Sequence, residues 1–337
     1  MVKITINYSE EIMIKYENVV LITDVAEKRE YSIKSNNSEG NSYKTTNDIL
    51  NALKKISKNV YHFDDVKRFK KEIFSISNPI VISVKYGLAN ENNKGDIPYF
   101  CDKHNIKYIG ADSYCHMLCN DKYLSKIYVD KFEINSPKGV IIYSYNKKFI
   151  LSQIYELHYP LIVKPNYGGG SNGIINKCFV NDNYELLKIA KKLLKYQKQP
   201  IIIEEYCEGY ELSIILVGNK NKINLFEEIQ LKFDNKEYYD KELFGLENKK
   251  INNNCKKERV SILSTENKNK IINLFKSFDK VEFMRFDCRI NDKDMYMIEL
   301  SPDCSLGKKS SVYEAFKYRN LSYVEMFEFL INNHLSN

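Results

Sequence analysis

The feature that most constrains the fold is a glycine-rich loop directly after a short apolar run, in the stretch Tyr159–Ile174 (YPLIVKPNYGGGSNGI). Leu161–Val163 is apolar and partly β-branched, which predicts a buried strand. Lys164 follows at the mouth of the loop, where glycines without Cβ let backbone N–H groups close around an anion. The stretch predicts a nucleotide phosphate site, and a plain glycine-rich hairpin turn is the alternative.

The residues after the loop argue against two common nucleotide-binding folds. The spacing of Gly168, Gly170 and Gly173 fits the dinucleotide fingerprint, which requires a helix directly after the loop. Ile174–Val180 instead predicts a second strand, so we expect a flap between two strands. Protein kinases use such a flap, but their lysine follows the loop and the chain contains no HRD or DFG triplet. Neither a Rossmann enzyme nor a kinase is favoured.

The order of the predicted elements indicates an α/β protein. Strands at Asn18–Thr23 and Pro79–Val84 alternate with helical patterns such as Thr45–Lys58, which predicts a parallel α/β unit. A further strand is expected at Val2–Tyr8. The part after Glu211 is richer in strands, and Asp234–Asn254 is charged and weakly patterned, which is typical of a lid. At 337 residues the chain exceeds the roughly 250–300 residues of a single core, so two or three domains are expected.

Composition excludes several functions. Eight cysteines without a CxxC and five isolated histidines disfavour zinc and a disulfide framework, and favour a cytoplasmic location. The net charge of +7 is spread along the chain, so no nucleic-acid partner is expected. No apolar run approaches the roughly 20 residues that span a bilayer, and the N-terminal sequence lacks a signal-peptide pattern. We therefore expect no membrane partner.

Two late strands carry an acidic site. Arg285 and Asp287 share one face of Phe283–Ile290, and Glu299 and Ser301 share one face of the next strand. The polar run between the two strands predicts a hairpin that brings these faces together. Carboxylates beside a phosphate loop are what Mg²⁺ requires, because the phosphates supply its remaining oxygens. A solvated hairpin face is the alternative.

The series of motifs resembles the ATP-grasp superfamily, and within it the D-alanine–D-alanine ligase-like branch. The motifs are KYIGADSYCHMLCNDKYLSK, PLIVKPNYGGGSNGI, IIIEEYCEGYEL and FMRFDCRI…YMIEL, which follow the family's order over Ile106–Leu335. The resemblance implies an ATP-grasp fold with three parts. These are an N-terminal parallel α/β (pre-ATP-grasp) domain at 1–116, a central lid subdomain with the glycine flap at 117–203, and a C-terminal α+β subdomain at 204–337.

The resemblance also implies roles for individual residues, with ATP and Mg²⁺ as cofactors. The resemblance assigns the phosphate contacts to Lys126 and Lys164, and the flap to Gly169, Gly170, Ser171 and Gly173. It assigns adenine binding to Glu204 and to the backbone of Glu205, Tyr206 and Cys207, and binding of the ribose hydroxyls to Glu211. The metal ligands are Asp287, Glu299 and Ser301, with Asp303 as a compensating ligand. The substrate contacts are Arg285 and Ser310, and the catalytic residues are Arg285, Lys164 and Ser171.

Three departures from the family pattern bear on the substrate. The third metal ligand, usually Asn, is Ser301. The lid's Tyr–Lys element has no convincing match, with only Lys241 and Lys249 as candidates. Thr23–Ser42 lacks the glycine-rich loop with a glutamate that holds the first D-alanine, so we expect a first substrate without a free α-amine at that place.

The sequence thus predicts an ATP-dependent ligase that joins small-molecule carboxylate and amine substrates through an acyl phosphate. An amino-acid or peptide ligase of specialised metabolism is the first interpretation. The alternatives are a D-alanine–D-alanine ligase of cell-wall synthesis and a nucleotide-binding protein without turnover. A homodimer is compatible with the resemblance.

Overall fold

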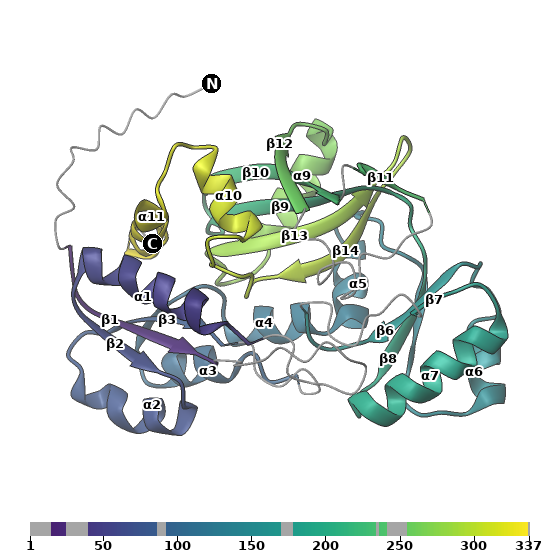
Figure 1. Ribbon diagram of the computed structural model, residues 1–337, viewed down its shortest axis with the longest axis horizontal. Helices are drawn as coiled ribbons and strands as arrows, with labels where there is room; N and C mark the ends of the chain where they lie inside the picture. Colours follow the sequence, from purple (N-terminus) through teal and green to yellow (C-terminus); the bar gives the residue numbers. More distant parts are fainter. Residues whose placement is uncertain are drawn as a thin grey trace.

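The computed structural model describes residues 15–24, 40–85, 92–169, 178–233, 236–240 and 255–335. Within these ranges the chain forms three β-sheets in separate regions of the molecule, with helices packed against them (Figure 1). Several predicted features lie outside the described residues: the strand Val2–Tyr8, the flap residues Gly170, Ser171 and Gly173, and the lid candidates Lys241 and Lys249.

The N-terminal sheet is parallel, as the alternation of strands and helices predicts. Its strand order is β2 (Ser57–Phe63), β1 (Tyr16–Thr23), β3 (Ile80–Val84) and β4 (Lys107–Ile109). The helices of this region are α1 (Tyr43–Ile56), α2 (Val66–Glu72) with a 3₁₀ turn at Ile73–Ser75, and α3 (Asp96–Lys103). Helix α1 begins at Ser42, whose hydroxyl accepts a hydrogen bond from the Thr45 amide and so satisfies one of the first amides of the helix.

The central region contains the glycine loop. Helices α4 (Ser113–Asn120) and α5 (Lys122–Asp130) lead into an antiparallel sheet of order β5 (Gly139–Ile142), β8 (Ile201–Glu205), β6 (Leu161–Pro165) and β7 (Phe179–Val180), covered by α6 (Lys147–Gln153) and α7 (Asn183–Gln197). Leu161 pairs with Val180 across β6 and β7. The loop therefore connects two paired strands, as the residues after it predict.

The C-terminal sheet is antiparallel. Its order is β12 (Cys255–Val260), β10 (Ile223–Phe233), β9 (Gly209–Gly218), β13 (Phe283–Ile290) and β14 (Met295–Ser301), and β11 (Tyr238–Tyr239) pairs with β9. Helices α9 (Thr265–Lys276), α10 (Ser311–Lys317) and α11 (Tyr323–Leu335) accompany it. The predicted hairpin is β13–β14, which places Asp287 directly opposite Glu299 and Arg285 opposite Ser301.

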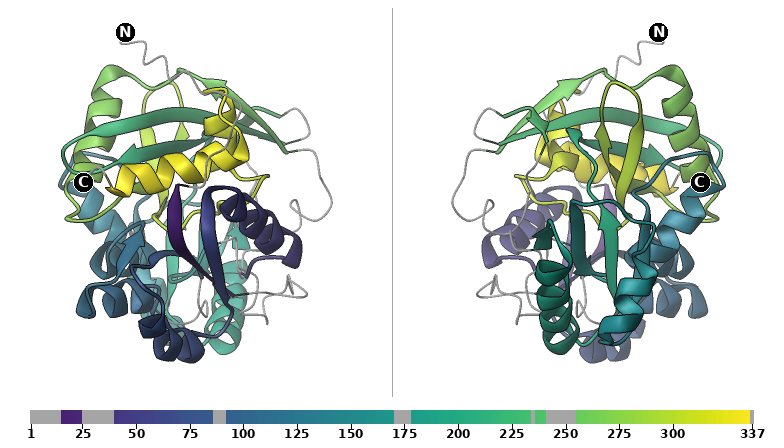
Figure 2. Two further views of the ribbon diagram at one scale, coloured as in Figure 1. Left: turned by 90° about the vertical axis from the view of Figure 1, so that its left-hand side faces the viewer. Right: turned by 90° about the vertical axis from the view of Figure 1, so that its right-hand side faces the viewer.

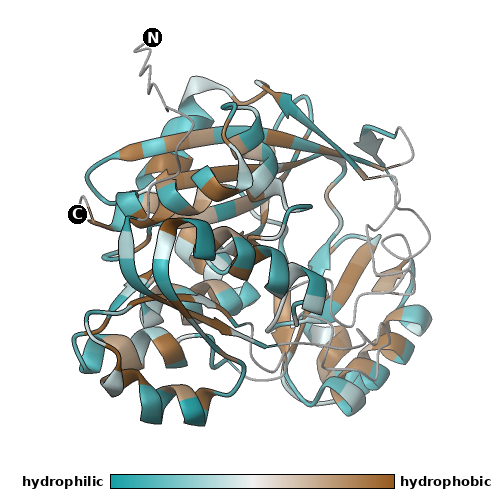
Figure 3. Ribbon diagram, turned by 60° about the vertical axis from the view of Figure 1, so that its left-hand side comes forward, coloured by the Kyte–Doolittle hydropathy of each residue, from teal (hydrophilic) through white to brown (hydrophobic). Residues whose placement is uncertain are grey.

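The N-terminal and C-terminal regions share one hydrophobic core. Leu53 and Ile56 of α1 pack in the same cluster as Phe327 and Ile331 of α11, and Ile215 of β9 belongs to it as well. Helix α11 packs against α1 and crosses it, and Figure 2 shows the yellow α11 above the purple N-terminal region. The central sheet has a separate core with α6 and α7. Apolar residues follow the strands of all three regions (Figure 3). No described helix combines the length and hydropathy needed to cross a bilayer.

Candidate active site

Two buried lysines meet one buried glutamate beside the glycine loop. Glu204 on β8 lies opposite Ile162 on β6, which places it two residues from the level of Lys164 and on the same face of the sheet. Glu204 forms ion pairs with Lys164 and with Lys126 of α5, the latter with 2.9 Å between Nζ and Oε2. All three side chains are buried. Since two cations share one carboxylate, the cluster keeps an excess positive charge, which suits a phosphate.

The protonation of this cluster follows from its charges. Burial favours the neutral carboxyl of Glu204, but the ammonium groups of Lys126 and Lys164 outweigh it and lower the pKa of Glu204 below its usual value. Burial lowers the pKa of Lys126, and the Glu204 carboxylate opposes that shift. Glu204 is therefore ionised at neutral pH, and its carboxylate orients both lysines at the mouth of the loop.

The base of the glycine loop is fixed by the start of α5. Asn166 accepts a hydrogen bond from the Tyr123 amide through Oδ1 (3.0 Å) and donates from Nδ2 to Asp121 (2.8 Å). The Gly168 amide donates to Asn120 Oδ1 at 3.0 Å. Gly168 has a φ of 86°, a left-handed conformation that glycine adopts without strain. These bonds fix where the predicted phosphate loop leaves the sheet.

Lys122 is a site residue that the motif-based prediction missed. Its ammonium donates to the carbonyl oxygen of Gly168 and lies 3.6 Å from Oε1 of Glu299 on β14. Lys122 therefore connects the base of the glycine loop with the acidic site on the C-terminal sheet. The signal was present in the sequence, because Lys122 and Lys126 are one helical turn apart and share a face of α5.

The residues predicted to hold adenosine lie at the end of β8 and the start of β9. Glu211 accepts two hydrogen bonds from Arg289 of β13, at 2.8 and 3.1 Å. Arg289 also donates to the Tyr206 hydroxyl at 3.2 Å. Glu205 accepts from the His158 amide at 2.9 Å, and Cys207 is partly buried beside them. The structure thus gathers the predicted adenosine residues and adds Arg289, which fixes the Glu211 carboxylate.

Asp287 and Glu299, which we call the acidic pair, both lie beside cations. Arg285 Nε donates to both carboxylate oxygens of Asp287 at 2.8 Å, and its Nη2 donates to Ser301 Oγ at 3.3 Å. The Ser213 hydroxyl donates to Asp287 at 2.7 Å. Lys122 lies beside Glu299 as described above. The structure therefore brings Arg285, Asp287, Glu299 and Ser301 together, as the strand pattern predicts.

This donor set fits Mg²⁺. In the part of the chain that the structure describes, no group of three or more His, Cys, Asp and Glu side chains is arranged so that it could hold a metal ion by itself. Two carboxylates and a hydroxyl are nevertheless sufficient for Mg²⁺, which completes its six oxygen ligands with water and nucleotide phosphates. Asp287 and Glu299 would hold the ion. Their present cationic partners, Arg285 and Lys122, would then turn toward the other ligands of the site.

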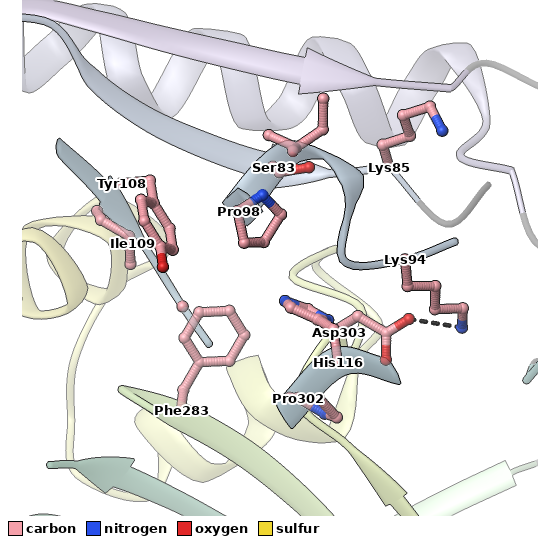
Figure 4. A pocket seen from close by; sticks show the side chains of 12 residues that line it. Ser83, Lys85, Lys94, Pro98, Tyr108, Ile109, His116, Phe283, Pro302 and Asp303 are labelled. Atoms are coloured by element: carbon pink, nitrogen blue, oxygen red, sulfur yellow. Dashed lines mark hydrogen bonds and ion pairs between the residues drawn. The ribbon is translucent and has the colours of Figure 1, made fainter. Parts of the chain in front are cut away.

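Two predicted residues lie in other surroundings. Asp303 forms an ion pair with Lys94 of the N-terminal region, at 2.7 Å from Nζ to Oδ2 (Figure 4). Ser310 is the N-cap of α10, where its hydroxyl accepts a hydrogen bond from the Tyr313 amide at 3.1 Å. The metal role of Asp303 and the substrate role of Ser310 stay predictions.

Comparison with known protein families identifies the same region. The family model described as D-ala D-ala ligase C-terminus matches residues 138–332, which is more than half of the chain. This range includes the glycine loop, the adenosine residues and the acidic hairpin. The match thus covers almost every residue that the motifs assign.

Individual relatives and solved structures agree with it. The D-alanine--D-alanine ligase of Pelagibacter ubique is 25% identical over 79% of this chain and 84% of its own length. That of Wigglesworthia glossinidia brevipalpis is 28% identical over 69% of this chain and 61% of its own length. The structure of D-alanine--D-alanine ligase from Bacillus anthracis complexed with ATP has a TM-score of 0.70 at 17% identity, covering 95% of this chain and 98% of that one. VanG D-Ala:D-Ser ligase from Enterococcus faecalis has a TM-score of 0.67 at 17% identity, over 95% and 100%. The structural matches establish the fold.

Proposed function

The chain belongs to the family described as D-ala D-ala ligase C-terminus, which is part of the ATP-grasp superfamily. From this membership we propose that it joins two D-alanine molecules. As an ATP-grasp ligase it forms a carbon–nitrogen bond, with ATP and Mg²⁺ as cofactors. The named relatives support D-alanine, the alternative of the sequence analysis, over the specialised-metabolism ligase that it puts first. The argument against D-alanine depends on Thr23–Ser42, and residues 25–39 of that segment lie outside the described structure.

The observation that carries the proposal is the position of Lys122. Its ammonium contacts Gly168 at the phosphate loop and lies 3.6 Å from the Glu299 carboxylate. A nucleotide whose phosphates bind at the glycine loop would therefore also have these phosphates close to Asp287 and Glu299. This is the arrangement that phosphoryl transfer to a substrate carboxylate requires, because catalysis there consists of positioning and charge neutralisation.

The side chains divide the reaction between them. Lys122, Lys126 and Lys164 would hold the phosphates and offset their charge, and Glu204 keeps two of these lysines in place. Bound Mg²⁺ would supply further charge neutralisation at the transferred phosphoryl group. Arg285 would bind the carboxylate of the substrate and then stabilise the oxyanion that forms when the amine attacks the acyl phosphate. The product would be an amide, with ADP and phosphate released.

The test is ADP release from Mg²⁺-ATP with single amino acids and with pairs, read together with mass spectrometry of the products. We expect D-alanine alone to stimulate ADP release and to yield a product of the mass of the dipeptide. The panel should include D-serine, L-alanine and N-acetyl-D-alanine. Release only with the acylated amino acid would contradict the proposal and favour the specialised ligase. ATP binding without release for any amino acid would favour a nucleotide-binding protein without turnover.

A further inference from the structure

A buried ion pair joins the N-terminal region to the turn between β14 and α10. Lys94 lies just before α3, and its Nζ is 2.7 Å from Oδ2 of Asp303 (Figure 4). The two side chains are 7% and 15% exposed. Buried pairs are more consequential than exposed ones, because removal of one partner leaves the other charge desolvated without compensation.

The backbone that carries Lys94 is held by α4. Asn92 donates to the Met117 carbonyl at 3.0 Å and accepts from Asn120 Nδ2 at 3.1 Å. Gly95 packs so closely on α4 that a Cβ there would lie 2.4 Å from Ser113 Oγ. The same Asn120 accepts from the Gly168 amide at the base of the glycine loop. Lys94 therefore extends from a segment that is fixed on α4, and the Asn120 side chain links this segment to the base of the glycine loop.

Asp303 lies between two residues of the predicted site. Ser301 precedes it at the end of β14, and Ser310 follows it at the start of α10. The segment between them contains no helix or strand. Its middle is held by the buried Leu306, whose carbonyl accepts a hydrogen bond from Tyr323 at 2.8 Å, and its start is held by the ion pair of Asp303 with Lys94. Exposed contacts to this segment are weaker restraints, among them the ion pair of Lys308 with Asp48 of α1 at 2.9 Å, with side chains 52% and 22% exposed.

The surroundings of the pair leave little room for an alternative arrangement. Lys94, Asp303, His116 and Phe283 line a cavity of about 20 Å³, which is space for one water molecule. The Nδ1 atom of His116 is buried there without a hydrogen-bond partner. Lys85 lines the same cavity, but the cation that forms the ion pair with Asp303 is Lys94.

We propose that Lys94 and Asp303 are positioning residues for the amino-acid half of the site. Their ion pair fixes the turn at 302–310 against the N-terminal region, and so sets Ser310 relative to the substrate carboxylate. The inference depends on the proposed ligase function. It assigns Asp303 to positioning in place of the metal ligand that the sequence suggests, so its loss should leave the affinity for Mg²⁺ unchanged.

The kinetic test compares Lys94→Gln and Asp303→Asn with Lys308→Gln, which removes the exposed ion pair to the same turn. We expect the KM for the amino acid to rise about tenfold in the first two variants, since small displacements of a substrate contact have effects of this order. The KM for ATP should stay within about twofold, because the phosphate loop keeps its own bonds. Lys308→Gln should match the parent. Equal rises for both substrates, or an unchanged amino-acid KM, would overturn the proposal.

The double variant Lys94→Gln/Asp303→Asn tests whether the two residues act as one unit. We expect its amino-acid KM to be no higher than that of the single variants, because each single variant already breaks the pair and leaves one buried charge uncompensated. Effects that multiply would show that the residues act separately and would overturn the proposal. Mg²⁺ affinity, measured by titration calorimetry in the presence of ATP, should be equal in Asp303→Asn and the parent; a loss would return Asp303 to the metal site.

A third measurement does not depend on turnover. Hydrogen exchange of the purified chain should show faster exchange at the amides of 303–310 in Lys94→Gln than in the parent or in Lys308→Gln. Unchanged exchange there would overturn the positioning role even if activity fell. If no amino acid stimulates ADP release in the parent, the ligase proposal fails, and the exchange experiment still decides whether Lys94 holds the turn.

Discussion

Arg285 and Asp287 neutralise each other on the polar face of β13, with the guanidinium Nε 2.8 Å from both carboxylate oxygens. The same guanidinium lies 3.9 Å from Glu299, the residue opposite Asp287. A divalent cation at this acidic pair would compete with Arg285 for Asp287. Binding of Mg²⁺ would therefore release the guanidinium for a substrate carboxylate, which couples the metal and the substrate.

The first prediction concerns this pair of residues. Asp287→Asn keeps the shape of the side chain but removes a charge from the metal site and a partner from Arg285. We expect kcat for ADP release to fall by about 10² or more, since the metal supplies much of the charge neutralisation at the phosphoryl group. Titration with Mg²⁺ in the presence of ATP should show weaker metal binding. Ser301→Asn, which restores an amide oxygen, should keep or raise activity; normal turnover in Asp287→Asn would place the metal elsewhere.

The second prediction concerns Lys164, whose substitution should affect both binding and stability. The Lys164 side chain is buried, with the residue 5% exposed, and it forms an ion pair with Glu204. Lys164→Ala should weaken ATP binding in calorimetry, because one phosphate contact is lost. It should also lower the free energy of unfolding by about 2 kcal/mol, less than the usual 3–5 for a broken buried pair, since Lys126 still offsets Glu204.

The double variant Lys164→Ala/Glu204→Gln tests the charge balance of the cluster. It removes the carboxylate that still pairs with Lys126, so this ammonium is left buried without that counter-ion, and the free energy of unfolding should fall further. ATP affinity should remain weak, because the phosphate contact of Lys164 is still absent. Full ATP affinity in Lys164→Ala would contradict the phosphate role.

The third prediction separates the ribose role of Glu211 from its structural role. Glu211→Gln should reduce the affinity for ATP several-fold, because a carboxylate accepts hydrogen bonds from hydroxyl groups better than an amide does. The affinity for 2′,3′-dideoxy-ATP, which lacks those hydroxyls, should change much less. Equal losses for the two nucleotides in a competition assay would show that Glu211 acts only by holding Arg289.

The fourth prediction concerns acid stability. Burial lowers the pKa of His116 to about 4, with Asp303 opposing the shift and Lys94 adding to it. The unfolded chain therefore binds a proton at this histidine between about pH 6.5 and pH 4 while the folded chain does not, so stability falls as the pH decreases through that range. The loss should approach about 3 kcal/mol at pH 4.

His116→Asn removes the titrating group from the cavity and is the variant for this test. Thermal midpoints at about pH 7.5 and about pH 5 should differ less in His116→Asn than in the parent. Asp303, whose pKa the ammonium of Lys94 lowers against the effect of burial, contributes only at lower pH. An identical pH dependence in parent and variant would contradict the shifted pKa.

Elements with strong periodicity could be predicted from the sequence. The β13–β14 hairpin is an example: alternation predicts its polar face, and the structure pairs Asp287 with Glu299 across it. The parallel N-terminal sheet follows from alternating strands and helices. These predictions hold because burial of one face dictates the pattern of side chains locally.

Contacts between distant segments could not be predicted. The Lys94–Asp303 pair joins residues 209 positions apart, and no periodic pattern reports which surface lysine will be buried by another region. Helix α4 was missed for a different reason: its Asp112 cap is followed by a short run of small and mixed residues without a clear apolar stripe. Lys122 was passed over because its role depends on Gly168 and Glu299, which lie in two other parts of the fold.

The core shared by α1 and α11 has a consequence for folding during synthesis. Tyr16 on β1 donates its hydroxyl proton to Asn332 on α11, 316 positions later. Strand β1 and helix α1 leave the ribosome before α11, and the apolar face they present is covered only after α11 has been translated. At about 5–20 residues per second, this leaves a window of many seconds in which that face is exposed. The central sheet, with a core of its own, can fold within that window. The N-terminal region is therefore completed only after the C-terminal helix has been made, and until then its apolar face is open to a chaperone.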